Sequence, residues 1–127
     1  MYQFNEEKGS VMVEFALVSV LLITLLVGIV QIGLVFNTQL TLENAASGGA
    51  RFVSLPIART DDEIVNYIKS LAPTVPLSSS NITVTPSVRT RGIPLTVKIV
   101  YDYPIPVTLG ILPDKYTLSV SSVTMQQ

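Results

Sequence analysis

An uncharged apolar run near the start of this chain limits what the chain can fold into. From Phe15 to Leu42 no residue is formally charged, and Val, Leu and Ile make up most of the run. Roughly 20 apolar residues span a bilayer as a helix, so the run is long enough to cross one. Glu14 stands directly before it, and a carboxylate at the entrance of a membrane segment is costly without a partner. No obvious partner lies within the same helix.

Composition limits both the size and the chemistry of the rest of the chain. At 127 residues, with 48% hydrophobic and 13% charged residues, there is room for one small domain outside a membrane. The net charge of −1 argues against a nucleic-acid partner. Histidine and cysteine are absent, which removes the usual metal ligands, the usual general base and any disulfide. We therefore expect no metal, no cofactor and no enzymatic activity.

Helix signals define two helices. One helix is predicted from about Val11 to about Phe52, weakening at Gly48-Gly49 and ended by Leu55-Pro56. A second, short helix is predicted to begin at Thr60, which has capping-box spacing to Glu63. Ile64, Ile68 and Leu71 recur at i, i+4 and i+7 and give this helix one apolar face. Pro73 and Pro76 end the helix.

Alternating apolar residues predict three strands after the second helix. The strands cover 82–85, 93–101 and 116–120, and a bulge or strand end is expected near Ser121-Ser122, because Val123 and Met125 fall out of phase. A small antiparallel sheet must cover its apolar face, and the short helix and the outer half of the long helix are available for this. The predicted fold class is α+β: a long N-terminal helix, transmembrane in its first half, followed by a short helix and a small antiparallel sheet.

The residues around Glu14 allow two interpretations. In the first, Gly9 is a loop residue before the helix and Glu14 lies in the headgroup zone. In the second, cleavage after Gly9 frees an α-amine on Ser10, and Glu14 neutralises the amine of a neighbouring subunit. Pairing between subunits would explain why the charge is kept at that depth, and it would fix the axial register of packed helices.

A cluster of small residues closes the long helix, and it also has two interpretations. Ala45, Ala46, Gly49 and Ala50 mark either a fraying helix end or a surface where helices approach closely. Within the apolar run, Ser19 and Thr24 can bond back to their own helix, and Gln31 is a candidate for a hydrogen bond between helices. We interpret Asp102, and Arg89 with Arg91, as solvated charges of loops or an edge strand.

Two groups of residues carry a family resemblance. Gly9-Ser10 followed by Glu14-Phe15 ahead of a long apolar helix resembles a prepilin processing site. The run Val13–Val18 (VEFALV), then Asn44-Ala45-Ala46 and residues 49–52 (GARF), is similar to the TadE-like pseudopilins of the tight-adherence (Tad/Flp) pilus. The resemblance covers roughly residues 9–54 and implies a type IV pilin-like fold. Phenylalanine at position 15 suits the TadE-like branch.

The resemblance implies processing, partners and location. A prepilin peptidase would cleave between Gly9 and Ser10, leaving Glu14 at the fifth mature position and Phe15 beside it for assembly. The parts would be a leader (1–9), an assembly helix (10–54) and a β-rich extracytoplasmic domain (55–127). Partners would be other pilin subunits, an inner-membrane assembly platform and, before assembly, membrane lipid. The chain would lie in the bacterial inner membrane with its N-terminus in the cytoplasm, then enter a pilus or remain in the periplasm.

A second function is compatible with the same residues. The chain would then be an uncleaved single-pass anchor whose distal domain binds a partner of a secretion apparatus. The two functions differ at Gly9, since only the first predicts that substitution of this glycine blocks processing and assembly.

Overall fold

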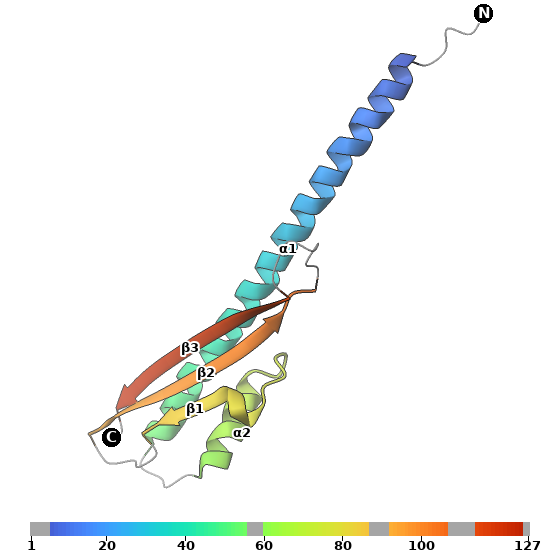
Figure 1. Cartoon of the computed structure of the whole chain (residues 1–127). Coiled ribbons are helices and arrows are strands. Elements are labelled where there is room, and N and C mark those ends of the chain that lie inside the picture. The colour runs from blue at the N-terminus through green and yellow to red at the C-terminus, as the bar shows by residue number, and fades with distance from the viewer. Residues whose placement is uncertain (1–5, 56–59, 87–91, 107–113, 126–127) are drawn as a thin grey trace, which may run out of the picture. The chain divides into compact units, whose positions relative to one another are not determined.

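The structure is a computed structural model, and it describes residues 6–55, 60–86, 92–106 and 114–125, with side chains from Gly9 onward (Figure 1). The chain divides into two compact units, Met1–Leu34 and Val35–Gln127. The division falls inside the first helix, α1. We call residues 9–34 the inner part of α1 and residues 35–54 its outer part.

Helix α1 runs from Glu6 to Ser54. It confirms the single long helix predicted from about Val11 to about Phe52 and extends it at both ends. The Ser54 hydroxyl donates to the Arg51 carbonyl in the last turn, at 2.8 Å. The helix continues through the Gly48-Gly49 pair, where the sequence predicted weakening, because both glycines lie against the second helix.

Helix α2 (Asp61–Leu71) begins at the predicted capping box. The Glu63 amide donates to the Thr60 hydroxyl at 3.3 Å, and the Thr60 amide donates to the Glu63 carboxylate at 3.0 Å. Both amides would otherwise lack an intrahelical partner. Ile64 and Ile68 are fully buried, as the predicted apolar face requires, whereas Leu71 is 37% exposed at the rim.

A short 3-10 helix, η1 (Ser79–Asn81), leads into a three-stranded antiparallel sheet. The strands are β1 (Ile82–Thr85), β2 (Pro94–Pro104) and β3 (Lys115–Met125), in the order β1-β2-β3. Ile99 pairs with Ile82 on one side and with Val120 on the other. These elements confirm the α+β fold class.

The bulge predicted near Ser121-Ser122 was wrong. β2 and β3 pair without interruption from Pro94 and Met125 at one end to Pro104 and Lys115 at the other. Val123 and Met125 break the apolar alternation because they lie on the outer face of the sheet, where they are 65% and 68% exposed. Apolar residues at solvent-side positions, rather than an extra residue in the strand, explain the change of phase.

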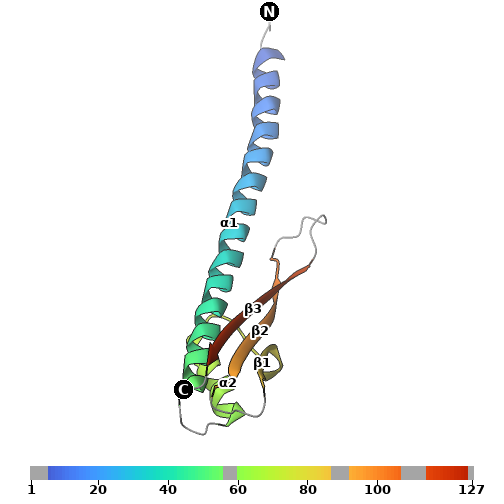
Figure 2. The same ribbon diagram turned by 90° about the vertical axis from the view of Figure 1, so that its left-hand side faces the viewer.

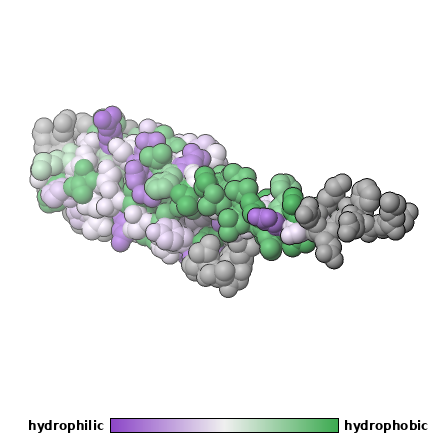
Figure 3. Space-filling view, turned by 90° about the horizontal axis from the view of Figure 1, so that it is seen from above, coloured by the Kyte–Doolittle hydropathy of each residue, from purple (hydrophilic) through white to green (hydrophobic). Residues whose placement is uncertain are grey.

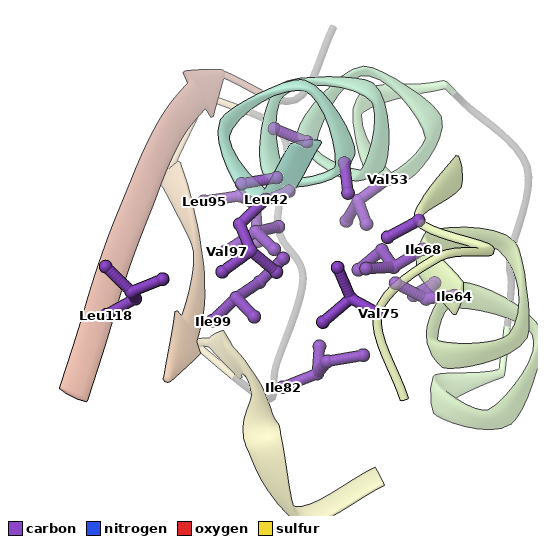
Figure 4. Packing of buried hydrophobic residues seen from close by; sticks show 14 residues of the cluster. Leu42, Val53, Ile64, Ile68, Val75, Ile82, Leu95, Val97, Ile99 and Leu118 are labelled. Carbon is purple, nitrogen blue, oxygen red and sulfur yellow. The ribbon is translucent and has the colours of Figure 1, made fainter. Parts of the chain in front are cut away.

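The outer part of α1 and α2 together cover the inner face of the sheet, as predicted (Figure 2). Figure 4 shows side chains from α1, α2, β1 and β2 pointing into one core. Each fully buried aliphatic side chain stabilises the fold by about 1.5–3 kcal/mol. The buried core consists of Leu42, Ala45, Ala46, Ala50, Val53, Ile64, Ile68, Ala72, Val75, Ile82, Leu95, Val97, Ile99 and Leu118.

Candidate processing and assembly site

Gly9 and Ser10 lie in the first turns of α1, and both are exposed. The structure thus places Gly9 inside the helix rather than in a loop before it. Apart from its chain neighbours and the nearby backbone of its own helix, no atom of the described residues lies within 4 Å of the position that a Cβ on Gly9 would take. A glycine weakens a helix by about 1 kcal/mol relative to alanine, and helix ends open most easily. The Gly9-Ser10 bond is therefore accessible and lies in a turn that needs little energy to unwind.

Glu14 and Phe15 follow in the next turn. Glu14 is exposed, and Phe15 is 73% exposed. Glu14 lies four residues after Ser10, so the two side chains share one face of the helix. Among the side chains that the structure describes, none forms a hydrogen bond or ion pair with Glu14. Its carboxylate stands at the head of an apolar surface and, in a membrane, requires a partner from outside the described chain.

The inner part of α1 exposes large apolar side chains on every side. The consecutive residues Leu21, Leu22 and Ile23 are 70%, 50% and 60% exposed. Because successive residues point about 100° apart around a helix, three such neighbours already cover most of its circumference. Figure 3 shows hydrophobic residues gathered on the visible surface of α1 near the N-terminal end of the chain. A helix that is apolar all round is stable only in lipid or among other helices.

The hydroxyl groups within the inner part are satisfied by their own helix, as predicted. Ser19 donates to the Ala16 carbonyl at 2.9 Å, and Thr24 donates to the Val20 carbonyl at 2.8 Å. Gln31 also has a partner in the structure, so its amide is not free. A proposal that Gln31 bonds to a second helix therefore needs an exchange of partners.

The small residues lie in the outer part of α1 and pack within the same chain. Ala45 and Ala46 are fully buried, and Ala50 is 2% exposed. A Cβ on Gly49 would lie 2.5 Å from Cγ1 of Ile68 and 3.8 Å from Cγ1 of Val97, so α1 approaches both α2 and β2 closely there. The Phe52 and Tyr67 rings stack beside this contact, with centroids 4.0 Å apart and planes 9° apart.

The polar residues of the domain form local hydrogen bonds. Asp102 accepts from the Thr117 hydroxyl at 2.8 Å on the outer face of the sheet. Arg89 and Arg91 lie outside the described residues. Within residues 6–55, 60–86, 92–106 and 114–125, no three acidic, histidine or cysteine groups lie together in a way that would hold a metal ion.

Asn81 is a structural residue that sequence reasoning missed. Its side-chain oxygen accepts from the Ser78 amide, and its side-chain nitrogen donates to the Val100 carbonyl, both at 2.8 Å. Asn81 thereby ties η1 to the middle of the sheet. The Ser78–Asn81 spacing matches that of a cap, which was the available signal.

The geometry defines a class of protein: a domain of two helical segments and a sheet, carried by a helix that is exposed and apolar. Among the described residues, Gly9–Ser54 is the one helix long and apolar enough to cross a membrane by length and composition. The most apolar stretch of this helix is not buried by any other described part of the chain. The protein is therefore a membrane-anchored protein with a single anchoring helix among the described residues.

Sequence comparison finds a similarity to one family over part of the chain. The family model of TadE-like proteins matches residues 9–51, about a third of the chain. The resemblance to TadE-like proteins is thus confirmed over residues 9–51. Comparison with curated proteins and with solved structures gave no match.

Proposed function

We propose that the protein is a prepilin-like structural subunit that assembles through α1 into a Tad/Flp-type pilus or its initiation complex. The observation that carries this proposal is the all-round apolar surface of the inner part of α1, headed by Glu14. An anchor alone requires apolar residues but no carboxylate at its entrance. A helix that moves from lipid into a bundle of like helices uses both features.

Before assembly, lipid covers the inner part of α1. Lipid tails are as apolar as leucine side chains, so exchanging lipid for neighbouring helices changes hydrophobic burial little. Van der Waals packing and polar contacts then decide whether the helices associate. Both before and after this exchange, the outer part of α1 stays packed in its own domain.

Glu14 supplies the polar contact that fixes the register. Cleavage between Gly9 and Ser10 by a prepilin peptidase would leave an α-amine four residues before Glu14. In a bundle, Glu14 of one subunit pairs with the amine of its neighbour, and Phe15 packs beside this pair. Removing one partner of a buried ion pair costs about 3–5 kcal/mol, so only one axial offset between neighbouring helices is favourable.

This function places the chain in the bacterial inner membrane, with its N-terminus in the cytoplasm and its domain on the other side. There it would contact the peptidase, the assembly platform and other pilin subunits, and later enter a pilus or remain in the periplasm. Lys8 before the apolar run is opposed by Arg51 and Arg59 after it, so the orientation rests on the family and not on flanking charge.

One observation favours the alternative function of an uncleaved anchored accessory protein. The small residues that would allow α1 to pack against other subunits are already buried in the domain of the same chain. An anchor with a rigid domain at its end would show the same burial.

The N-terminus of the chain isolated from native membranes distinguishes the two functions. We would determine its intact mass and N-terminal sequence in cells with and without the prepilin peptidase. A chain that begins at Ser10, and only when the peptidase is present, supports the prepilin subunit. A chain that keeps residues 1–9 in both cells supports the anchored accessory protein.

A matched pair of variants separates processing from helix stability. Gly9→Ala should abolish cleavage, whereas Gly28→Ala, which makes the same change at another open helical position, should leave cleavage intact. Equal cleavage of both variants would contradict processing at Gly9.

A further inference from the structure

The sheet ends in two edge strands, and both have backbone groups that point away from the sheet. Figure 1 shows β2 between β1 and β3, in agreement with the strand order. In an antiparallel pair, every second residue of a strand bonds to its neighbour, and the residues between direct their N–H and C=O groups away from it. The Ile82 amide donates to the Ser79 carbonyl. No other outward backbone group of β1 or β3 bonds to a residue that the structure describes, so each edge can accept a further strand.

The edge formed by β3 has none of the features that commonly protect an edge strand. Sheet edges are usually protected by charged residues, by proline, by a bulge or by being very short. β3 covers 11 residues, from Lys115 to Met125, and it pairs with β2 without a bulge. From Tyr116 to Met125 it contains no charged residue and no proline. Its outward edge is therefore a long, neutral and regular template for another strand.

The edge formed by β1 is shorter but has the same character. Its four residues, Ile82–Thr85, include no charge and no proline. Ile82 is buried on the inner face and Thr83 is exposed on the outer face, and the side chains of β3 alternate in the same way. Because β1 and β3 both pair antiparallel with β2, they run in the same direction. A second β1 that continues the sheet beyond β3 would therefore pair with β3 in parallel.

The difference between the two edges determines which partner fits. A contact between two unlike surfaces of one chain can repeat into an open filament, whereas a contact of one surface with itself closes as a dimer. Pairing of β3 with β3 would stop at two copies. Pairing of β3 with β1 leaves a free β1 at one end and a free β3 at the other, so it can repeat. The uncharged residues of both edges also cause no repulsion between copies.

We propose that a second copy of this chain binds at each edge of the sheet, with β3 of one subunit pairing in parallel with β1 of the next. This inference rests on the proposed function, because it takes the open, repeating assembly from it. The contact involves only elements of the unit Val35–Gln127. Since β1 has four residues, one contact forms few hydrogen bonds. The pairing therefore adds to assembly through α1 and does not replace it.

Disulfide cross-linking between two different copies tests the proposal, because the chain contains no cysteine of its own. Neighbouring strands lie about 4.8 Å apart, and disulfides join residues whose Cα atoms are about 4.4–6.8 Å apart. We would produce two full-length chains with different tags in cells that make the pilus machinery, and then oxidise the intact cells. One chain carries Thr83→Cys on β1. The other carries a single cysteine on β3, in place of Ser119, Ser121 or Val123.

The cysteine positions share the outer face of the sheet and are exposed, so the fold should tolerate the changes. Lys98→Cys is the matched control for Thr83→Cys. Lys98 is exposed on the same face and pairs directly with Thr83, but it lies on the central strand β2. A strand added beyond β1 would be two strand spacings from Lys98, about 10 Å, which is too far for a disulfide.

We expect a disulfide between the two tags for Thr83→Cys with at least one of the three β3 positions, and none for Lys98→Cys. Equal cross-linking of Thr83→Cys and Lys98→Cys would overturn the proposal, because it would reflect random collision. A β3 cysteine that cross-links only to the same β3 position of another copy would also overturn it, since the contact would then close as a dimer.

The inner part of α1 separates failure of this inference from failure of the proposed function. Cysteines between Val18 and Leu26 that cross-link in the same cells, without any disulfide between β1 and β3, would overturn the edge pairing and leave the proposed function standing. If neither α1 nor the sheet edges cross-link, assembly through α1 fails, and the edge pairing fails with it.

Discussion

The inner and outer parts of α1 belong to one continuous helix, yet only the outer part buries one of its faces. Leu22 in the inner part is 50% exposed, whereas Leu42 in the outer part is fully buried. The outer part turns its small and aliphatic residues toward α2 and the sheet, and the inner part has no such partner among the described residues of its own unit. The comparison teaches that hydrophobicity alone does not show what a helix packs against. The arrangement of small and polar residues distinguishes the part that completes a domain from the part that needs lipid or other subunits.

The largest expected effect is the difference between substitutions of two glutamates of α1, Glu14 in the inner part and Glu43 in the outer part. Glu14→Gln should abolish assembly while cleavage continues, because the Ser10 amine of a neighbour would lose its partner at a cost of about 3–5 kcal/mol. Glu43→Gln should assemble normally, since Glu43 is exposed and accepts a hydrogen bond from Gln39 of its own helix, at 3.1 Å. Counting filaments by electron microscopy measures the difference. Equal assembly of both variants would contradict the claim that assembly depends on the inner part and not on the outer part.

Truncation of one leucine in each part should affect the stability of the domain to very different extents. Leu42→Ala should destabilise it by about 2–5 kcal/mol, because the leucine is fully buried and its removal leaves a cavity. Leu22→Ala should change stability by less than about 0.5 kcal/mol, because that side chain does not contribute to the core. Urea unfolding in detergent, followed by the near-ultraviolet circular dichroism of the tyrosines, measures both. A loss of stability for Leu22→Ala as large as that for Leu42→Ala would contradict the division of α1 into an inner and an outer part.

Substituting one glycine in each part of α1 by alanine tests the same comparison. Gly49→Ala should cost about 1–3 kcal/mol, because the new Cβ would lie 2.5 Å from Cγ1 of the buried Ile68. Gly28→Ala meets no atom within 4 Å and should be neutral or slightly stabilising. The same unfolding measurement applies. A neutral Gly49→Ala would show that α1 and α2 are not closely packed there.

The smallest expected effect concerns the cap of α2. Thr60→Ala should destabilise the domain by about 0.5–2 kcal/mol, because the Glu63 amide loses its acceptor. Thr83→Ala on the exposed side of β1 serves as the control and should cost less. Thermal unfolding in detergent ranks the two variants. A larger loss at Thr83 would mean that the capping box adds little to the docking of α2.

Much of the fold could be predicted from local sequence. The capping box of Thr60 and Glu63, the long α1 and the three strands each depend on neighbouring residues, so a local pattern suffices to predict them. The phase of Val123 and Met125 misled the prediction because these apolar residues lie on the outer face of the sheet, away from the core. No local pattern contains that information.

The candidate site was less predictable than the fold. Gly9, Ser10 and Glu14 stand out in the sequence by their spacing before an apolar run. The role of the small residues was left open, because burial of Ala46 and Gly49 depends on α2 and β2, which come later in the chain. The stacking of Phe52 on Tyr67 and the packing of Val35 against the core likewise require the three-dimensional register.

Cross-linking along α1 tests the central claim most directly, because the chain contains no cysteine. We would place single cysteines at successive positions from Val18 to Leu26, with Ala46→Cys as the buried control, and oxidise intact cells that produce the pilus machinery. The account predicts intermolecular disulfides from the inner part that recur with a period of about 3.6 residues, vanish without the peptidase and are absent for Ala46→Cys. An inner part that forms no intermolecular disulfide at any position would contradict assembly through α1 and leave it a lipid anchor.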